Sequence, residues 1–328
     1  MVRPMLAAPH GMDPWLILLL ALALDAVVGD PRWLYRAVPH PVALMGRLIE
    51  AGDARLNDPA APRRARLAWG AALSAALVGG AAILGWGVER GLAGLPGGWT
   101  IEAVLASTLI AGRGLFDHVR AVADALERDL GAARAAVAHI VGRDPNALDP
   151  AGVARAAAES AAENFADGVV APVVWFALFG LGGLAAYKAL NTLDSMIGHR
   201  TTRHEAFGKA AARADDVANW LPARLAGLLI VVAAAVLPEA NGARAWRAMG
   251  RDARRHRSPN AGWPEAALAG ALDLALAGPR RYGGETVADA WMGTGRADLD
   301  AADLRRVLRL YAGAWAVLAG AVAAIVLA

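Results

Sequence analysis

The stretch ESAAENFADGVVAPVVWFALFGLGGLAAYKALNTLDSMIGH, residues 159–199, decides the fold because it turns from acidic to apolar and then to polar again. Three acidic residues spaced four apart, Glu159, Glu163 and Asp167, are followed by the uncharged run 168–187. A run of this length suits an α-helix in the hydrocarbon core of a bilayer. Carboxylates are costly near lipid and usually have a specific partner. The stretch therefore predicts a membrane helix flanked by polar sites.

The composition extends this prediction to the whole chain. Hydrophobic residues are 57% of the 328 residues, too many for an ordinary soluble protein, while charged residues still make up 19%. The positive charge is almost entirely Arg in the connections between apolar runs, which is typical of cytoplasmic loops of membrane proteins rather than of nucleic-acid binding. The absence of Cys excludes disulfides, thiolate zinc sites and a Cys nucleophile. We expect an all-α polytopic membrane helix bundle with amphipathic helices in long polar loops.

We expect a single integral membrane domain over residues 1–328, placed in the inner cell membrane with its active-site loops in the cytoplasm. Its candidate spans are 14–28, 68–88, 100–112, 168–187, 221–237 and 307–328, joined by a helical polar loop at 113–167 and a polar loop at 238–306.

The topology around residues 168–237 stays open at this point. The connections 113–167, 188–220 and 238–306 are all rich in Arg, so they belong on one side of the membrane. If 168–187 and 221–237 both cross, however, 188–220 lies on the opposite side. Pro172 and the glycines near Gly180 permit a broken or re-entrant element instead, where it is buried in protein.

The acidic stretch is a candidate metal site. Asp149 and Pro150 predict a helix start, with Asp149 as the N-cap. On that helix Glu159, Glu163 and Asp167 advance about 40° per step and form one stripe. Carboxylates beside a membrane suit Mg²⁺, which also accepts phosphate and water as ligands. The alternative is a solvated helix face.

Two further polar segments border the apolar runs. In KALNTLDSMIGHR, Lys188, Asn191 and Asp194 fall at helical spacing and His199 follows, which indicates a lined site. In RADDVANWLPARL, Asp215 and Asp216 form a second acidic edge that favours a cation site shared with the first. The alternatives are snorkelling of the lysine and ordinary helix capping.

Four arginines precede a turn and a helix that we expect to begin at Pro264. A helix N-terminus behind an Arg cluster suits an anion, although juxtamembrane positive charge explains the cluster equally well. The phosphate-binding candidates are Arg251, Arg254, Arg255, Arg257, Asn260 and Arg281. A rigid His40 between Pro39 and Pro41 is a candidate ligand or base, with a purely structural role as the alternative.

The runs GDPRWLYRAVPHPVALMGRLI (29–49), residues 159–199, SPNAGWPEAALAGAL (258–272) and RRYGGE (280–285) together resemble the adenosylcobinamide-phosphate synthase family. The resemblance covers roughly residues 16 to 310 and rests on several long motifs in the same order. It implies an integral membrane enzyme of cobalamin biosynthesis. Such an enzyme joins the free propionate of adenosylcobyric acid to aminopropanol, or to its phosphate, in an amide ligation that uses ATP and Mg²⁺.

The resemblance gives the candidate residues a common chemistry, although their roles are our own assignment. Forming an amide from a carboxylate requires activation, and phosphoryl transfer requires cations around the phosphates. The acidic edges would hold Mg²⁺, the arginines, Asn191 and His40 would bind substrate, and Asp194 or His199 would deprotonate the amine, with Lys188 beside them. The expected partners are the corrinoid, the amine, the lipid bilayer and other enzymes of the cobalamin pathway.

Two other functions remain open from the sequence. In a transporter or channel, Asp25 and the acidic edges would line an ion path, but most charges here lie at the edges of spans. A non-catalytic membrane sensor or scaffold would not require this density of Asn, Asp and His.

Overall fold

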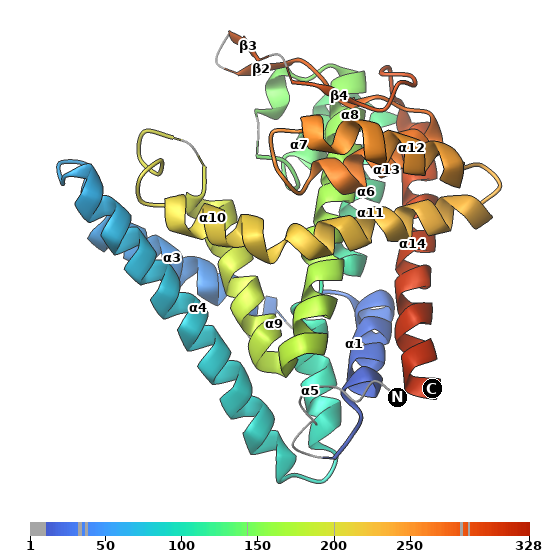
Figure 1. The fold of residues 1–328 in the computed structure, drawn as a ribbon. Helices are drawn as coiled ribbons and strands as arrows, with labels where there is room; N and C mark the ends of the chain where they lie inside the picture. Colours follow the sequence, from blue (N-terminus) through green and yellow to red (C-terminus); the bar gives the residue numbers. More distant parts are fainter. Residues whose placement is uncertain are drawn as a thin grey trace. The chain divides into compact units, whose positions relative to one another are not determined.

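The computed structural model describes residues 11–31, 35–36, 39–142, 144–199, 201–282, 285–287 and 289–328, with backbone only at 280–282 and 285–287. Within these residues the chain is almost entirely helical, which confirms the all-α prediction (Figure 1). It divides into two compact units, of which the first is Met1–Ala111, Ala171–Asn219 and Val322–Ala328 and the second is Gly112–Val170 and Trp220–Ala321. Each unit is described by itself.

Unit 1 is built from six helices of the described residues. They are α1 (Pro14–Val28), α3 (Pro41–Leu56), α4 (Arg63–Ala93), α5 (Gly98–Ser107), α9 (Ala171–Ile197) and α10 (Lys209–Ala218). The expected spans 14–28 and 68–88 correspond to α1 and to the centre of α4. The expected span 100–112 is wrong as a single helix, because α5 ends at Ser107 and the next helix begins only at Gly112.

Helix α9 folds back on itself at Gly180. The backbone there has φ 66° and ψ −156°, which is far from helical. The rings of Trp175 and Tyr187 lie 6.4 Å apart and nearly parallel. In a straight helix, a separation of twelve residues would place them about 18 Å apart. The uncharged run 168–187 therefore contains a helical hairpin, visible as a V in Figure 1, at the glycines that permitted a broken or re-entrant element.

The tip of the hairpin is packed against α4. Trp86 donates a hydrogen bond from its indole nitrogen to the carbonyl oxygen of Phe179, at 2.9 Å. A Cβ atom at Gly182 would meet the Trp86 ring at 2.3 Å, and one at Gly85 would meet the backbone of Gly182 at 2.7 Å. The glycines therefore allow the two backbones to approach closely, as in helix pairs within membranes.

Unit 2 contains most of the polar connections and most of the last helix. Its helical elements are α6 (Gly112–Leu126), α7 (Leu130–Val137), η1 (Pro145–Ala147), α8 (Pro150–Phe165), the π-helical turn η2 (Ala166–Val170), α11 (Trp220–Val236), α12 (Gly242–Asp252), η3 (Ala253–Arg255), α13 (Gly262–Leu272) and α14 (Ala301–Leu327) up to Ala321. Asp149 caps α8 as predicted, since its carboxylate accepts a hydrogen bond from the Gly152 amide. Pro264 is not the first residue of its helix, because α13 begins at Gly262.

The polar loop 238–306 also contains short strands, which the sequence did not predict. They pair antiparallel as β1 (Leu276–Ala277) with β4 (Trp291–Met292), and as β2 (Arg280–Tyr282) with β3 (Glu285–Val287). Residues 272, 274, 276 and 292 are buried, so this segment is packed onto the helices rather than extended into solvent.

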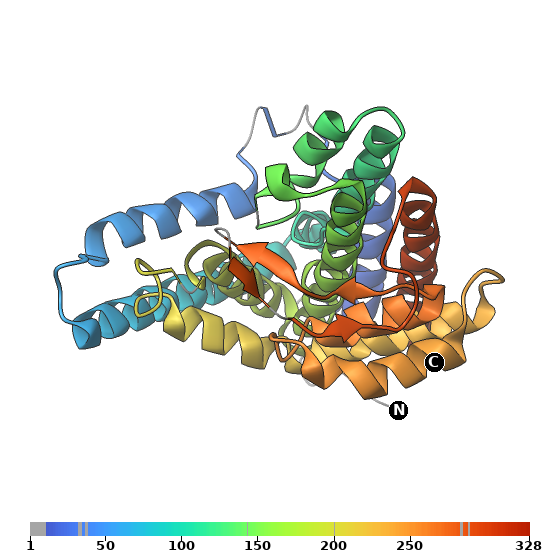
Figure 2. The ribbon, with the colours of Figure 1, turned by 90° about the horizontal axis from the view of Figure 1, so that it is seen from above.

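Helix α11 runs across α14 rather than along it (Figures 1 and 2). The two helices meet near Gly313, where a Cβ atom would lie 3.0 Å from Leu237, just beyond the end of α11. Arg309 of α14 is paired with Glu239 at the same level. From this point toward its C-terminus α14 is apolar.

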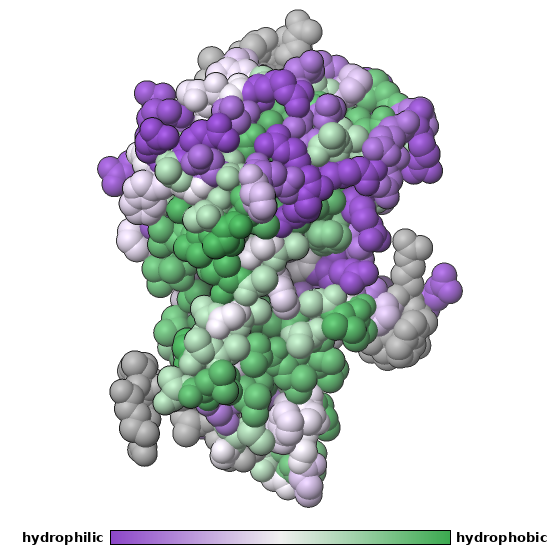
Figure 3. Space-filling model, turned by 90° about the vertical axis from the view of Figure 1, so that its right-hand side faces the viewer, coloured by the Kyte–Doolittle hydropathy of each residue, from purple (hydrophilic) through white to green (hydrophobic). Residues whose placement is uncertain are grey.

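By length and composition, three helices of the described residues suit a membrane span: Arg63–Ala93, the continuous run Pro150–Ile197 that contains the hairpin, and Ala301–Leu327. A fourth candidate is the pair α10 and α11, bent by 46°. The surface that carries α14 is hydrophobic over much of its extent and hydrophilic at one end (Figure 3). The chain is thus a membrane protein.

Candidate functional site

The second arm of α9 carries the residues of the expected polar site in unit 1, and they divide over two faces of the helix. Lys188 and Thr192 line a cavity of about 450 Å³ together with His40 and Asp30. Asn191 lies one residue before Thr192 and reaches α10 instead. The second arm of α9 therefore has the cavity on one face and the acidic cluster on another.

The acidic cluster is centred on Asp215, which is buried in α10. Its carboxylate accepts hydrogen bonds from Asn219 at 2.9 Å and from Asn191 at 3.5 Å. Asn219 in turn accepts a hydrogen bond from the hydroxyl of Tyr187, at 2.8 Å. Asp194 and Asp216 lie near enough for their negative charges to act on Asp215.

The cluster brings the carboxylates of Asp194, Asp215 and Asp216 together near α10. Three partly buried carboxylates repel one another, so a nearby positive charge stabilises their ionised form. Among the described residues, no group of three or more His, Asp or Glu side chains could hold a metal ion. Mg²⁺ commonly takes one or two carboxylates and completes its shell with phosphate and water.

His40 lines the cavity, but both of its ring nitrogens are engaged. Nδ1 accepts a hydrogen bond from the Val42 amide, at 3.1 Å, and thereby caps the N-terminus of α3. Nε2 lies 3.4 Å from a carboxylate oxygen of Asp30. These contacts describe a histidine that orients the start of α3.

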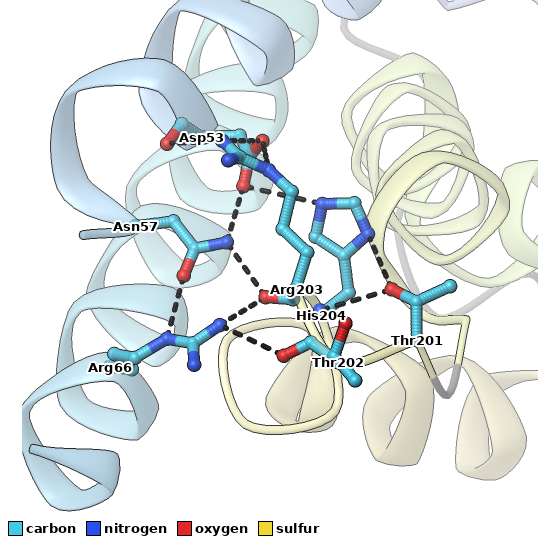
Figure 4. Close-up of polar contacts among 7 residues, drawn as sticks. All are labelled: Asp53, Asn57, Arg66, Thr201, Thr202, Arg203 and His204. Atoms are coloured by element: carbon cyan, nitrogen blue, oxygen red, sulfur yellow. Dashed lines mark hydrogen bonds and ion pairs between the residues drawn. The ribbon is translucent and has the colours of Figure 1, made fainter. Parts of the chain in front are cut away.

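A polar cluster holds the connection between α9 and α10, and the sequence did not reveal it. Arg203 donates to the Asp53 carboxylate at 2.9 and 2.7 Å, and Nε2 of His204 lies 3.4 Å from it (Figure 4). Asn57 donates to Asp53 at 2.7 Å and to the carbonyl oxygen of Arg203 at 3.0 Å, while Arg66 donates to Asn57. We call Asp53, Asn57, Arg66, Arg203 and His204 the Asp53 cluster.

Burial opposes ionisation of Asp53, but the hydrogen bonds from Asn57 and Arg203, together with the nearby His204 ring, outweigh it and hold the pKa of this carboxyl below its ordinary value. The cluster therefore fixes the connection that joins His199 to α10. His199 itself is exposed, and its charge acts on Asp194.

The expected acidic stripe of unit 2 does not stay together on one surface. Glu159 is buried, and its carboxylate accepts a hydrogen bond from the Ala277 amide at 2.9 Å. Glu163 is exposed, whereas Asp167 is half-buried inside η2. The π-helical turn shifts the register between Glu163 and Asp167, so a spacing of four residues no longer defines one face. Glu159 thus has a structural contact with the β1 segment.

Most of the expected phosphate-binding arginines are paired with carboxylates. Arg251 makes two hydrogen bonds to the buried Asp252, at 2.8 and 2.6 Å, and Arg255 lies 3.8 Å from it. Burial opposes ionisation of Asp252, but Arg251 and the Gly293 amide outweigh it and lower its pKa. Arg257 lies 3.6 Å from Asp289.

The other three expected phosphate-binding residues are not seen in such ion pairs within the described structure. Arg254 is exposed and has no carboxylate partner among the described residues. Asn260 is buried in the turn before α13. The backbone of Arg281 lies in β2, and its side chain is outside the described part of the structure.

The chain resembles known proteins over nearly its whole length. The family model described as CobD/Cbib protein matches residues 18–311. A cobalamin biosynthesis protein CobD from Sinorhizobium sp is 50% identical over 94% of this chain and 97% of its own length. Proteins of the same name from Brucella suis biovar 1 and Rhodobacter capsulatus are each 47% identical, over 94% and 92% of this chain and 96% and 93% of their own lengths. No solved structure matches the chain.

Proposed function

Because the chain belongs to the CobD/CbiB family of cobalamin biosynthesis proteins, we propose that it joins adenosylcobyric acid to aminopropanol, or to aminopropanol phosphate, through an amide bond. In this reaction the amine nitrogen bonds to the carbon of the free propionate carboxylate. The carboxylate first takes the terminal phosphoryl group of ATP and ADP is released. The amine nitrogen then displaces phosphate, which carries one carboxylate oxygen away, and the ammonium group loses two of its three protons to base and solvent.

The observation that carries this proposal is the pairing of a cavity with an acidic cluster on one arm of α9. Lys188 lines the cavity, and a lysine in this place suits a carboxylate or phosphate of a substrate. Asp194, Asp215 and Asp216 gather on the α10 side. Amide ligation requires both features, a site for an anionic substrate and a place for the cation that accompanies ATP.

The residues of the cluster have distinct roles in the proposal. Asp215 and Asp216 would hold Mg²⁺, which neutralises charge on the phosphates when it is bound. Asp194 accepts a proton from the ammonium group of the amine, and the nearby His199 passes it to solvent. Asn191 and Asn219 fix the orientation of Asp215 through their hydrogen bonds.

We place the protein in the inner cell membrane with this site at the cytoplasmic side. The connections rich in Arg support that orientation through the positive-inside rule. ATP and the corrinoid intermediates are both supplied from the cytoplasm in this arrangement.

The test is ligation by purified protein in detergent with adenosylcobyric acid, aminopropanol phosphate, ATP and Mg²⁺, and with the corrinoid analysed by mass spectrometry. We expect the wild type to form the condensation product. We expect Asp215→Asn and Asp194→Asn to lower the rate by about 100-fold or more, since each removes a charge that the transition state requires. Asp298→Asn, the same change at an exposed aspartate, serves as the matched control and should leave the rate unchanged.

Two outcomes contradict different parts of the proposal. If folded Asp194→Asn and Asp215→Asn retain the rate of Asp298→Asn, the α9–α10 cluster is not the active site. If monodisperse wild type forms no product with either amine, the proposed reaction itself is wrong for this chain.

A further inference from the structure

A second cluster of charge in unit 2 has the opposite sign, and the ligation reaction does not use it. Arg224, in the first turns of α11, lies against Trp263 at the start of α13. Arg254 is in η3, which packs against the same start of α13, since a Cβ atom at Gly262 would lie 2.3 Å from the carbonyl oxygen of Ala253. The positive charge of Arg254 therefore acts on Arg224. Neither guanidinium has a carboxylate partner among the described residues. Their neighbours Arg251, Arg255 and Arg257 are all paired with Asp252 or Asp289. Two adjacent cations without a carboxylate partner attract an anion from outside the chain.

The side chain of Arg224 is held in a fixed position by aromatic rings. Its guanidinium carbon lies 4.1 Å from the centre of the Trp220 ring and 4.5 Å from that of Trp263. It also donates a hydrogen bond to the carbonyl oxygen of Trp220. Stacking between two rings leaves the edge of a guanidinium available, and that edge is the part that matches phosphate oxygens in a bidentate manner.

The acidic residues of the neighbouring segments have other partners. Asp252 is paired with Arg251 and Arg255. Glu265 is buried at the start of α13, and its carboxylate lies 3.6 Å from Nε2 of His256. Arg254 therefore differs from its neighbours Arg251, Arg255 and Arg257, each of which lies close to a carboxylate.

The position of α11 shows which molecules can reach this pair. The far end of α11 crosses α14 near Gly313, where α14 becomes apolar (Figure 1). We therefore expect α11 to lie near the membrane surface. Trp220 and Leu221 are 55% and 48% exposed, and Leu228, Val232 and Val236 are exposed further along the helix. A tryptophan and arginines at the start of a helix with an exposed apolar face are typical of the interfacial region.

We propose that Arg224 and Arg254 form a binding site for a phosphate group, carried either by a phospholipid head group or by a free phosphate-bearing solute. Both guanidiniums donate hydrogen bonds to the phosphate oxygens, while Trp220 and Trp263 hold Arg224 in place. The proposal does not depend on the ligation reaction, because binding requires neither corrinoid nor amine.

The experiment uses the full chain in an uncharged detergent and has two arms. In the first, native mass spectrometry measures binding of palmitoyl-oleoyl-phosphatidylglycerol against the diacylglycerol with the same chains, which lacks the phosphate. In the second, equilibrium dialysis measures binding of radiolabelled inorganic phosphate. We expect Arg224→Gln and Arg254→Gln each to weaken the binding seen in wild type by about tenfold or more, since each removes a charge-assisted hydrogen bond.

Control variants distinguish binding from folding. Arg247→Gln removes an exposed arginine on the neighbouring α12 and should change affinity less than about twofold, as expected for a surface charge without a contact to the ligand. Arg224→Lys keeps the charge but loses the planar fork, so it should bind more weakly than wild type while remaining monodisperse.

Each outcome decides the proposal. Phosphate-dependent binding in the lipid arm alone assigns the site to a head group, and binding in the phosphate arm alone assigns it to a soluble ligand. The proposal is overturned if wild type binds neither probe, or if Arg254→Gln binds as tightly as Arg247→Gln.

Discussion

Asp53 joins two segments that are 150 residues apart in the chain, and it does so in a charged form. Its side chain is only 15% exposed, so its contacts with Arg203 and His204 are poorly screened by solvent. The nearby pair of Arg63 and Glu205 has a similar geometry, but both side chains are about half exposed. A comparison of the Asp53–Arg203 pair with the Arg63–Glu205 pair therefore measures how burial changes the contribution of an ion pair to stability.

We expect Asp53→Asn to destabilise the protein by roughly 1–3 kcal/mol at neutral pH, because it leaves Arg203 without its charged acceptor. The pKa of Asp53 lies below its ordinary value. The stabilisation is therefore complete above the ordinary pKa of an aspartate, about 3.9, and is lost as the pH falls through the lower folded-state pKa. Thermal unfolding of wild type and Asp53→Asn is followed by intrinsic tryptophan fluorescence between pH 7 and pH 3. It measures the difference in stability between the two proteins at pH 7 and the loss of that difference at low pH.

The control for this prediction is Glu205→Gln, which removes the exposed ion pair of the same loop. We expect no measurable change in its melting temperature, because exposed pairs contribute little to stability. Equal effects of the two substitutions at pH 7 would contradict the role given to the Asp53 cluster.

Predictions about single residues were confirmed where the contacting residues are close in the sequence. Contacts between residues far apart in the sequence could not be predicted. The capping of α8 by Asp149 was confirmed because the cap and its acceptor are three residues apart. The contact of Glu159 with Ala277 spans 118 residues, and no spacing of acidic residues reveals it. The same holds for Arg224 and Trp263, which lie on different helices and appear in the sequence only as one charge and one aromatic residue.

At the scale of elements, the hairpin of α9 depends on a single backbone position. Gly180 has φ 66° and ψ −156°, a region that only glycine occupies readily. A Cβ atom at this position would also lie 2.7 Å from a carboxylate oxygen of Glu89. We expect Gly180→Ala to destabilise the protein by about 1–3 kcal/mol from backbone strain alone, measured as a fall in the melting temperature in detergent.

Gly87→Ala in α4 is the matched control, since a Cβ atom at Gly87 meets nothing within 4 Å. Replacing an exposed glycine within a helix should be neutral or stabilise the protein by up to about 1 kcal/mol. If Gly180→Ala melts at the same temperature as Gly87→Ala, the hairpin tip does not require glycine.

The sequence predicted that an apolar helix follows Asp167 but not that it turns back. An uncharged run such as 168–187 satisfies the length of a span, and periodicity does not distinguish one straight helix from two short arms. Pro172 and the glycines only permitted the bend, and the decisive contacts come from Trp86 and Tyr187, on α4 and on the opposite arm. The short strands after α13 were missed for the same reason, since each pairs over only two or three residues.

At the scale of the whole molecule, the distribution of Arg favours one membrane topology. Within unit 1 α9 turns back at Gly180, and within unit 2 α11 runs across α14. We expect neither 168–187 nor 221–237 to cross the membrane, so that the connections 113–167, 198–208 and 238–306 share one side, in agreement with the positive-inside rule. We expect this side to be the cytoplasm.

The chain contains no cysteine, so single cysteines report this topology without background. We expect a membrane-impermeant maleimide to label Leu95→Cys, in the connection from α4 to α5, in intact spheroplasts. Ala147→Cys, Thr202→Cys and Ala243→Cys, each at an exposed position of an Arg-rich connection, should react only after the membrane is permeabilised. If α9 crossed the membrane and α11 returned the chain, Thr202→Cys alone among these three would react from outside. Labelling of Ala243→Cys but not Thr202→Cys would instead mean that α9 is a hairpin and that α10 and α11 together form a bent span.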